Sequence, residues 1–263
     1  MIAEEEIGSK MRFAVISDLH SNIEALTNVL QDIDDRGIDP IYCLGDVVGY
    51  GPDPRACIDL VRERCAFCIR GNHDDALFTG PDRFNPYARH AIEWTKTRLK
   101  PGLFKPRSNN DRWQFLEELP LDLRLGDHYF VHGSPRDHVN EYIYREDVFF
   151  NADSKLKTIF KSVDRLLFVG HTHLPVIISD DMKTLVPEEG KQEFKLDPDR
   201  KYIINVGSVG QPRDRDSRSC YVEYDNDVIR YHRVAYDIQK VVDKINANPS
   251  LDSVLGSRLL EGM

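Results

Sequence analysis

Five short apolar segments of this chain each end directly at polar side chains of the kinds that bind metal ions. Strands buried on both faces read as such continuous apolar runs, and the carboxyl ends of neighbouring strands meet in one crevice. Any one such end is better explained as a cap or a turn. Five such segment ends in one chain, however, predict a shared metal site. The polar residues at these ends are Asp18, His20, Asp46, Asn72, His132, His171 and His173.

The last of these segments is followed by two histidines that are only two residues apart. The apolar run at residues 166–169 is followed by Gly170, His171, Thr172 and His173. Residues two apart in an extended backbone point the same way, so both imidazoles are predicted to face one pocket. Taken alone, such a histidine pair is more often a surface or capping feature. The metal-binding residues after the other four segments favour the interpretation as metal ligands.

The first half of the chain alternates strands with helices. Residues 13–16 predict a buried strand, after which Ser21 and Glu24 form a capping box for a helix that stops at Gly37. A strand at 41–44 is followed by a helix with Asp53 as its cap. A third strand follows at 67–69. This alternation predicts an α/β domain with a largely parallel sheet.

The rest of the chain does not continue this regular alternation of strands and helices. Residues 76–120 predict a helical insertion, with helices at 86–99 and 111–119, which could act as a lid. In the helix at 86–99 the apolar face is expected at Tyr87, His90, Ala91, Trp94 and Leu99. The polar segment at 180–201 is expected to form a hairpin or an excursion on the sheet edge, and residues 221–234 a hairpin turning at 225–227. The expected domain division is a tail at 1–10, a main domain at 11–236 and a helical extension at 237–263.

Charge and cysteine content exclude several classes of function. The net charge of -9 argues against a broad basic surface for long nucleic acid or anionic membrane. No apolar run approaches a membrane span, and residues 1–10 lack the core of a secretory signal. Five cysteines are an odd count in a chain without an export signal, so free thiols are expected. We therefore expect a cytoplasmic protein that does not bind membranes.

Four histidines lie outside the strand ends and are interpreted as structural: His90, His128, His138 and His232. His138 follows His132 within the same loop, so the alternative that His138 faces the pocket is retained.

The motif order Asp-x-His, Gly-Asp, Gly-Asn-His-Asp, His-Gly and Gly-His-Thr-His resembles the calcineurin-like metallophosphoesterase superfamily over residues 11–236. Residues 17–26, 45–54 and 207–213 are most similar to its compact bacterial and archaeal phosphoesterases. The resemblance implies a four-layer αββα sandwich of the metallo-dependent phosphatase type, classed as α+β in some schemes, with a helical insertion after the third motif.

The resemblance also implies two divalent metal ions. It assigns Asp18, His20, Asp46 and His173 to the first ion, and Asp46, Asn72, His132 and His171 to the second. Oxygen and imidazole ligands suit Mn, Fe, Zn, Ni or Co, and a shared carboxylate can bridge two ions about 3.5–4 Å apart. By the same resemblance, a hydroxide between the ions attacks phosphorus in line, and His73 is the catalytic acid that protonates the leaving group.

Two positions depart from the protein phosphatases of this superfamily. Gly49 and Tyr50 stand where those enzymes have Asp and Arg. The carboxylate that would orient His73 and one phosphate-binding arginine are therefore missing, which favours a small or diester substrate over a phosphoprotein. Arg213 is predicted to bind the substrate phosphate in place of that arginine, with a surface salt bridge as the equal alternative, and Arg70 is interpreted as structural.

The leading hypothesis is a binuclear metal-dependent phosphoesterase that hydrolyses a small phosphodiester or nucleotide. A nuclease, a dinucleoside polyphosphate hydrolase or a phosphomonoesterase is the enzymatic alternative. A non-catalytic interaction scaffold on the same fold is the alternative from another class, and the complete ligand set with His73 disfavours it. Fold analogy specifies neither the natural substrate nor the oligomeric state.

Overall fold

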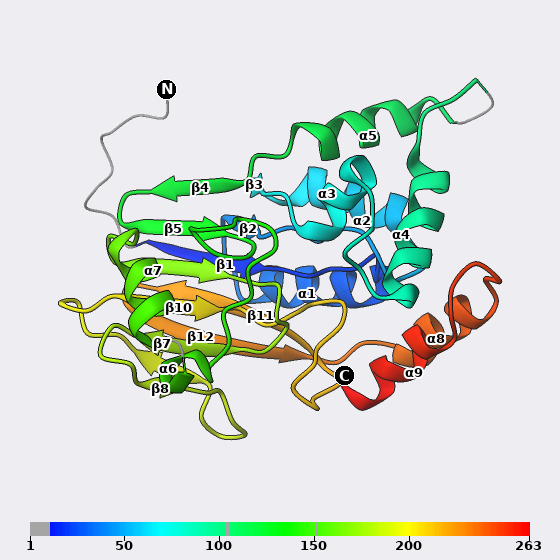
Figure 1. The fold of residues 1–263 in the computed structure, drawn as a ribbon. Coiled ribbons are helices and arrows are strands. Elements are labelled where there is room, and N and C mark those ends of the chain that lie inside the picture. The colour runs from blue at the N-terminus through cyan, green and yellow to red at the C-terminus, as the bar shows by residue number, and fades with distance from the viewer. Residues whose placement is uncertain (1–10, 104–105, 151) are drawn as a thin grey trace.

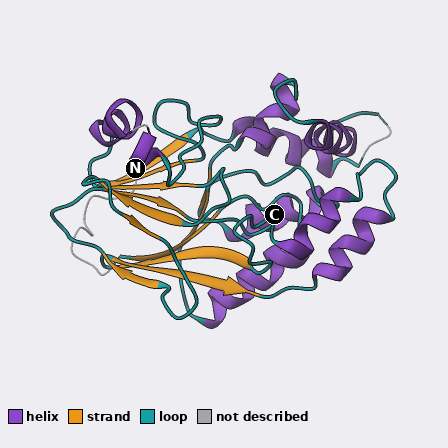
Figure 2. Cartoon of the chain, turned by 60° about the horizontal axis from the view of Figure 1, so that its bottom comes forward, coloured by secondary structure: helices purple, strands orange, loops and turns teal. Residues whose placement is uncertain are grey.

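Two six-stranded sheets lie face to face at the centre of the protein. The computed structural model describes residues 11–103, 106–150 and 152–263, so the predicted tail at 1–10 lies outside the described residues. Figure 1 shows the chain from the N-terminus in blue to the C-terminus in red, and Figure 2 shows the strands as two stacked layers.

The first sheet combines the parallel strands of the N-terminal half with a hairpin from the C-terminal half. Its order is β3-β2-β1-β11-β12-β9. Strands β1, β2 and β3 pair in parallel, whereas β11, β12 and β9 pair antiparallel. The bounds are β1 (Arg12–Ile16), β2 (Ile41–Cys43), β3 (Phe67–Cys68), β9 (Glu193–Lys195), β11 (Ser219–Asp225) and β12 (Val228–Val234).

The second sheet is also mixed, with the order β4-β5-β6-β10-β7-β8. Its parallel pairs are β5 with β6 and β6 with β10. The bounds are β4 (Asp122–Leu125), β5 (His128–Val131), β6 (Leu166–Val169), β7 (Val176–Ser179), β8 (Thr184–Leu185) and β10 (Tyr202–Asn205). The expectation of one largely parallel sheet was therefore wrong. Hairpins from the second half of the chain supply antiparallel partners in both sheets.

The alternation of side chains along the strands separates three apolar cores. Phe13 and Val15 of β1 point between the sheets, where they meet Phe130 and Phe168. Ala14 and Ile16 point the other way, against helix α1 (Ile23–Asp35). The outer face of the second sheet packs on α7 (Lys157–Lys161), which follows α6 (Asp147–Phe150) and a π-helical turn (Ala152–Leu156). The order of layers is helix, sheet, sheet and helix, which confirms the αββα sandwich.

Two helix starts differ in detail from the prediction. Asn22, not Ser21, caps α1, because its side-chain oxygen accepts a hydrogen bond from the Ala25 amide at 3.1 Å. Glu24 instead forms an ion pair with Lys244 at 2.7 Å. Helix α2 (Pro54–Arg64) does follow Asp53, but the Asp53 side chain forms no cap hydrogen bond, and its carboxylate binds Lys244 at 2.7 Å. Lys244, which is distant in the sequence, therefore binds both acidic side chains that were expected to cap helices.

The helical insertion contains α3 (Asn72–Thr79), α4 (Pro86–Leu99) and α5 (Ser108–Glu118). The bounds of α4 agree with the prediction, but its buried face differs. Tyr87 is 44% exposed and His90 is exposed, whereas Ala88, Ile92 and Thr95 are buried with Ala91 and Leu99. The packing of α4 against α2 and α3 therefore selects smaller side chains than periodicity alone suggests.

The C-terminal extension consists of α8 (Ile238–Asn246) and α9 (Val254–Glu261). Val241, Ile245, Leu255 and Leu259 join the same core as α1. No helix among the described residues combines the length and apolarity that crossing a membrane requires. All five cysteines are free thiols, as expected.

His128 gives a prediction about stability. It is 5% exposed between the sheets, where its ring contacts Phe13, Phe168 and Tyr224. Burial lowers the pKa of His128 more than the nearby Asp127 raises it. The unfolded chain therefore binds a proton near pH 6.5 that the folded chain does not. His128 should lower the free energy of unfolding below that pH, by at most about 1.4 kcal/mol per pH unit.

The variant His128→Phe should therefore lose less stability than the wild type between pH 7 and pH 5, measured by urea unfolding in the presence of a chelator. His90→Phe, at an exposed histidine, is the control and should follow the wild type. Parallel profiles for His128→Phe and the wild type would contradict the assignment.

Candidate metal centre

The loops that follow β1, β2, β3, β5 and β6 bring all seven predicted ligands together at one end of the two sheets. Asp18, His20, Asp46, His132, His171 and His173 are at most 4% exposed, and Asn72 is half-buried at the start of α3. Buried clusters of carboxylate and imidazole groups are costly unless they are paired or bind a metal.

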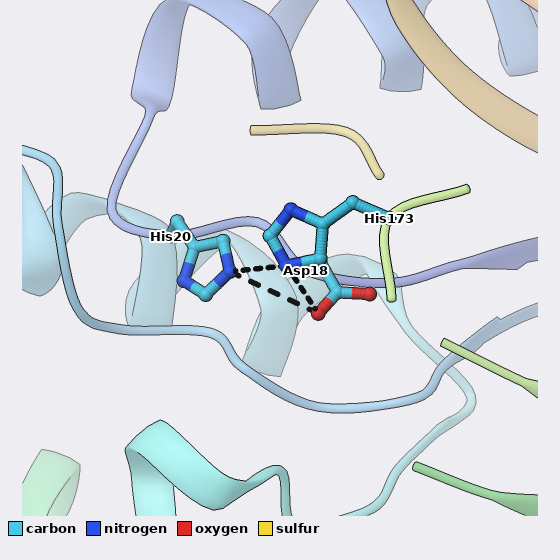
Figure 3. Close-up of side chains that lie close together, drawn as sticks. All are labelled: Asp18, His20 and His173. Carbon is cyan, nitrogen blue, oxygen red and sulfur yellow. Dashed lines mark hydrogen bonds and ion pairs between the residues drawn. The ribbon is translucent and has the colours of Figure 1, made fainter. Parts of the chain in front are cut away.

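The first group of ligands consists of Asp18, His20 and His173. The Nε2 atom of His173 lies 3.2 Å from Asp18 Oδ1 and 3.1 Å from His20 Nε2, and the His20–Asp18 distance is 3.8 Å. Figure 3 shows these atoms turned toward one another. Two ligands that are each about 2.1 Å from one ion lie roughly 3.0–3.4 Å apart in tetrahedral or octahedral geometry. The spacing therefore fits a single ion.

The second group forms around His132. Its Nε2 atom lies 3.2 Å from Asn72 Oδ1, 3.2 Å from His171 Nδ1 and 3.5 Å from Asp46 Oδ2. The same Asp46 oxygen is 3.8 Å from His20 Nε2 in the first group. Asp46 therefore stands between the two groups.

Backbone carbonyl groups fix the orientation of all four imidazoles. A carbonyl oxygen only accepts hydrogen bonds, so the ring nitrogen that faces it carries the proton. The other nitrogen of each ring then presents a lone pair to the centre, as a metal ligand requires. The pairs are His20 Nδ1 with Val48 O at 3.2 Å, His132 Nδ1 with Leu44 O at 2.8 Å, His171 Nε2 with Asn140 O at 3.2 Å and His173 Nδ1 with Gln211 O at 2.5 Å.

The two carboxylates are oriented in the same way. Asp18 Oδ2 accepts a hydrogen bond from the His171 amide at 3.1 Å, and Asp46 Oδ1 accepts one from the His73 amide at 2.8 Å. Asp18 Oδ1 is buried and has no hydrogen-bond partner among the described residues. One oxygen of each carboxylate is thus held by the backbone, and the other faces the ligand group.

Backbone strain is concentrated in these loops. Five predicted ligands have left-handed backbones, with φ between 47° and 66°: Asp18, His20, Asp46, His171 and His173. Such residues persist only where the surrounding structure determines them, and they gather at functional sites. Gly170 permits one close approach, because a Cβ atom there would lie 2.1 Å from Ser17 Oγ.

The electrostatics of the centre favour a cation. Burial, followed by the charge of Asp18, raises the pKa of Asp46 well above its usual range. Burial alone would raise the pKa of Asp18, but its interactions with His173, His132 and His20 together outweigh burial and lower that pKa. Burial also lowers the pKa of His171 to about 2, so this imidazole is neutral at pH 7. Two close carboxylates among neutral imidazoles lack positive charge, which divalent ions would supply. The residues present therefore fit the two ions.

His73 lies beside the ligands, at the second position of α3. Its ring packs against His20 at 4.8 Å, Tyr50 at 4.5 Å and Phe84 at 4.8 Å. Its Nδ1 atom is buried without a hydrogen-bond partner in the described chain. A Cβ atom on Gly49 would lie 2.2 Å from that nitrogen, and Gly49 has φ 95°. Aromatic packing over a glycine therefore orients His73, in place of a carboxylate.

Arg213 points toward the same centre. Its Nη2 atom donates to Gln211 Oε1 at 2.8 Å and lies 3.5 Å from the Tyr50 hydroxyl. Within the described residues it forms no ion pair with a carboxylate, so the surface salt bridge is not the arrangement observed. Arg70 does pair with Asp75 at 3.2 Å, in agreement with a structural role.

A cavity of about 370 Å³ opens onto the centre. Beyond the predicted residues, its walls include Arg83, Phe84 and Asn85 from the insertion, and Asn140 and Tyr142 from the loop after β5. No motif spacing in the sequence marks these five residues, so they were not predicted. His138 instead contacts the Tyr129 hydroxyl at 3.2 Å and does not line this cavity.

Comparisons with known proteins agree with this geometry. A family model described as the calcineurin-like phosphoesterase superfamily domain matches residues 11–227. An uncharacterized protein of Methanocaldococcus jannaschii is 40% identical over 265 residues, which cover 96% of this chain and 99% of that protein. The crystal structure of a metallophosphoesterase from Sphaerobacter thermophilus is 37% identical, with a TM-score of 0.80, and the match covers 97% of this chain and all of the other.

A more distant similarity covers part of the chain. A bis(5'-nucleosyl)-tetraphosphatase of Oceanobacillus iheyensis is 28% identical over 134 residues, which are 44% of this chain and 52% of that protein.

The two ligand groups give a prediction about metal content. His173→Ala should empty the first position and His171→Ala the second, so each variant should retain about one ion where the wild type binds two. Metal analysis after dialysis against Mn²⁺ measures this, and the double variant should retain none. Loss of the same single ion in both variants would show that the ligands are not divided in this way.

Proposed function

The chain belongs to the calcineurin-like phosphoesterase superfamily, and on that basis we propose that it is a binuclear metal-dependent hydrolase of small phosphodiesters or nucleotides. The observation that carries the proposal is the position of Asp46 Oδ2, which faces His132 at 3.5 Å and His20 at 3.8 Å. Two divalent ions, when bound, would neutralise the phosphate oxygens and supply an activated water molecule. Manganese is the ion we propose to test first.

His73 is proposed to protonate the leaving alcohol. It lines the cavity beside the ligands, and its amide holds the Asp46 carboxylate in place. Burial, and then the charge of Arg213, keep the pKa of His73 well below its usual range. A bound phosphoester brings negative charge that opposes the effect of Arg213, so His73 gains its proton most readily when substrate is present.

Two arginines are proposed to recognise the phosphate. Arg213 and Arg83 both line the cavity, and neither forms an ion pair with a carboxylate within the described chain. A guanidinium group without an acidic partner is suited to bind a phosphate oxygen through charged hydrogen bonds. This local positive charge supports a small anionic substrate in a chain whose net charge is -9. The free thiols further support our proposal of a cytoplasmic location.

A dinucleoside polyphosphate is the second candidate substrate. The partial similarity to a bis(5'-nucleosyl)-tetraphosphatase favours it, and the two arginines of the cavity, which have no carboxylate partner among the described residues, could bind two phosphates. A phosphomonoester and a non-catalytic scaffold are the remaining alternatives.

Hydrolysis assays test the proposal directly. The Mn²⁺-loaded protein should hydrolyse bis-p-nitrophenyl phosphate faster than p-nitrophenyl phosphate. His73→Gln should lower kcat by roughly 10²–10⁴ while the metal content stays at two ions. Absence of hydrolysis of every ester, with two ions bound and the protein folded, would exclude the enzyme and favour the scaffold.

Arg213→Met tests phosphate binding. Losing a charged hydrogen bond should raise KM by roughly tenfold or more. Arg218→Met is a matched control in the same loop, because Arg218 is half-exposed and pairs with Asp216. Equal changes in KM for both variants would contradict a role of Arg213 at the phosphate.

A further inference from the structure

A second cavity, of about 320 Å³, lies directly behind the loops of the candidate centre. Three chain segments contribute neighbouring residues to both cavities. Tyr142, His173 and Arg213 line the first cavity, and the residues that follow them, Ile143, Leu174 and Asp214, line the second. The same three chain segments therefore line both cavities.

A column of stacked rings runs from the metal ligands to the second cavity. The Tyr142 ring lies 3.8 Å from that of His171, with an interplanar angle of 16°. Tyr144 stacks on Tyr142 at 5.5 Å and 11°, and Tyr144 lines the second cavity. Both tyrosines are 39% exposed. A molecule bound at the metals could therefore follow the two tyrosines from one cavity to the other.

The segment that carries the two tyrosines is held firmly. Lys155 Nζ donates to the Tyr142 carbonyl at 2.5 Å, and the Tyr144 amide donates to Asp147 Oδ2 at 2.9 Å. His171 is fixed to the same loop through Asn140 O. These contacts fix the backbone from which both rings project, and a segment held in this way loses little conformational freedom on binding.

The chemistry of the second cavity differs from that of the first. Its walls are mainly aliphatic, formed by Ile143, Leu174, Pro175, Val176, Val186 and Pro187. The charged residues at its edge already have partners: Arg145 pairs with Glu146 at 2.7 Å, and Asp214 pairs with Arg233. The first cavity instead presents Arg83 and Arg213, neither of which pairs with an acidic residue in the part of the chain that the structure describes. The second cavity therefore suits an uncharged apolar group and not a second phosphate.

We propose that the second cavity binds an apolar alkyl or aryl arm of the phosphoester whose phosphate lies at the metal centre. The substrate class is then a phosphodiester with one apolar substituent that crosses the Tyr142–Tyr144 stack. This inference rests on the proposed function for the ester chemistry, but the binding it describes can be measured without hydrolysis.

Binding of n-alkylphosphonates to the Mn²⁺-loaded protein provides that measurement, because their carbon–phosphorus bond is not an ester. Calorimetric titration with methyl-, butyl- and octylphosphonate should show affinity that rises by up to about fourfold per methylene until the cavity is filled. The heat capacity change should become more negative with chain length. Equal affinity for all three phosphonates would overturn the proposal.

Substitutions at Val186 test whether the alkyl chain binds in the second cavity. Val186→Trp fills the cavity and Val186→Asp places a charge in it, so each should remove the dependence of affinity on chain length. Leu121→Trp, at a residue that is 43% exposed and lines neither cavity, is the matched control and should retain it. A chain-length dependence that survives in both Val186 variants would place the alkyl group elsewhere and contradict the inference.

Hydrolysis of methyl and octyl p-nitrophenyl phosphate separates this inference from the proposed function. A higher kcat/KM for the octyl ester supports both. Hydrolysis of the two esters at equal rates supports the proposed phosphoesterase activity and contradicts the binding of an apolar arm in the second cavity. Chain-length-dependent phosphonate binding without hydrolysis of either ester supports the cavity and overturns the enzyme.

Discussion

The stacking of the two sheets is the interaction on which the candidate centre depends. Phe130 and Phe168 stack at 5.0 Å between the sheets, and Phe13 contacts both rings. This contact aligns the ends of β1 and β2 with those of β5 and β6. Hydrogen bonds then join the sheets at the site, from the ring of His132 to Leu44 O and from the His171 amide to Asp18. Both ligand groups draw residues from the two sheets, so neither sheet alone could form them.

Local geometry adds a second level of constraint. The left-handed backbones at Asp18, Asp46 and His173 are unfavourable for residues with a Cβ atom, and backbone hydrogen bonds to neighbouring loops hold them. The result is a set of donor atoms that face one another at 3.1–3.8 Å. A divalent ion held by these atoms would in turn stabilise the strained loops.

Much of this arrangement could be predicted from the sequence because the relevant signals are local. Strand β6 is an uninterrupted apolar run, β1 and β5 are apolar after their first residues, and each strand is followed closely by metal-binding side chains. The short strands β8 and β9 lie at sheet edges, where the polar segment 180–201 was expected. The sequence did not reveal β4, a short polar segment that becomes a strand only because β5 pairs with it. Nor did it reveal that Lys244, from the C-terminal extension, binds Glu24 and Asp53. The residues Arg83, Phe84 and Tyr142 reach the cavity through tertiary packing, which leaves no periodic signature.

The central claim is that Asp46 joins two metal ions. Anomalous diffraction from crystals of the protein loaded with Mn²⁺ tests it most directly. We expect two peaks about 3.5–4 Å apart, on either side of Asp46 Oδ2, one beside His173 and the other beside His171. A single peak, or two peaks that do not share Asp46, would contradict it.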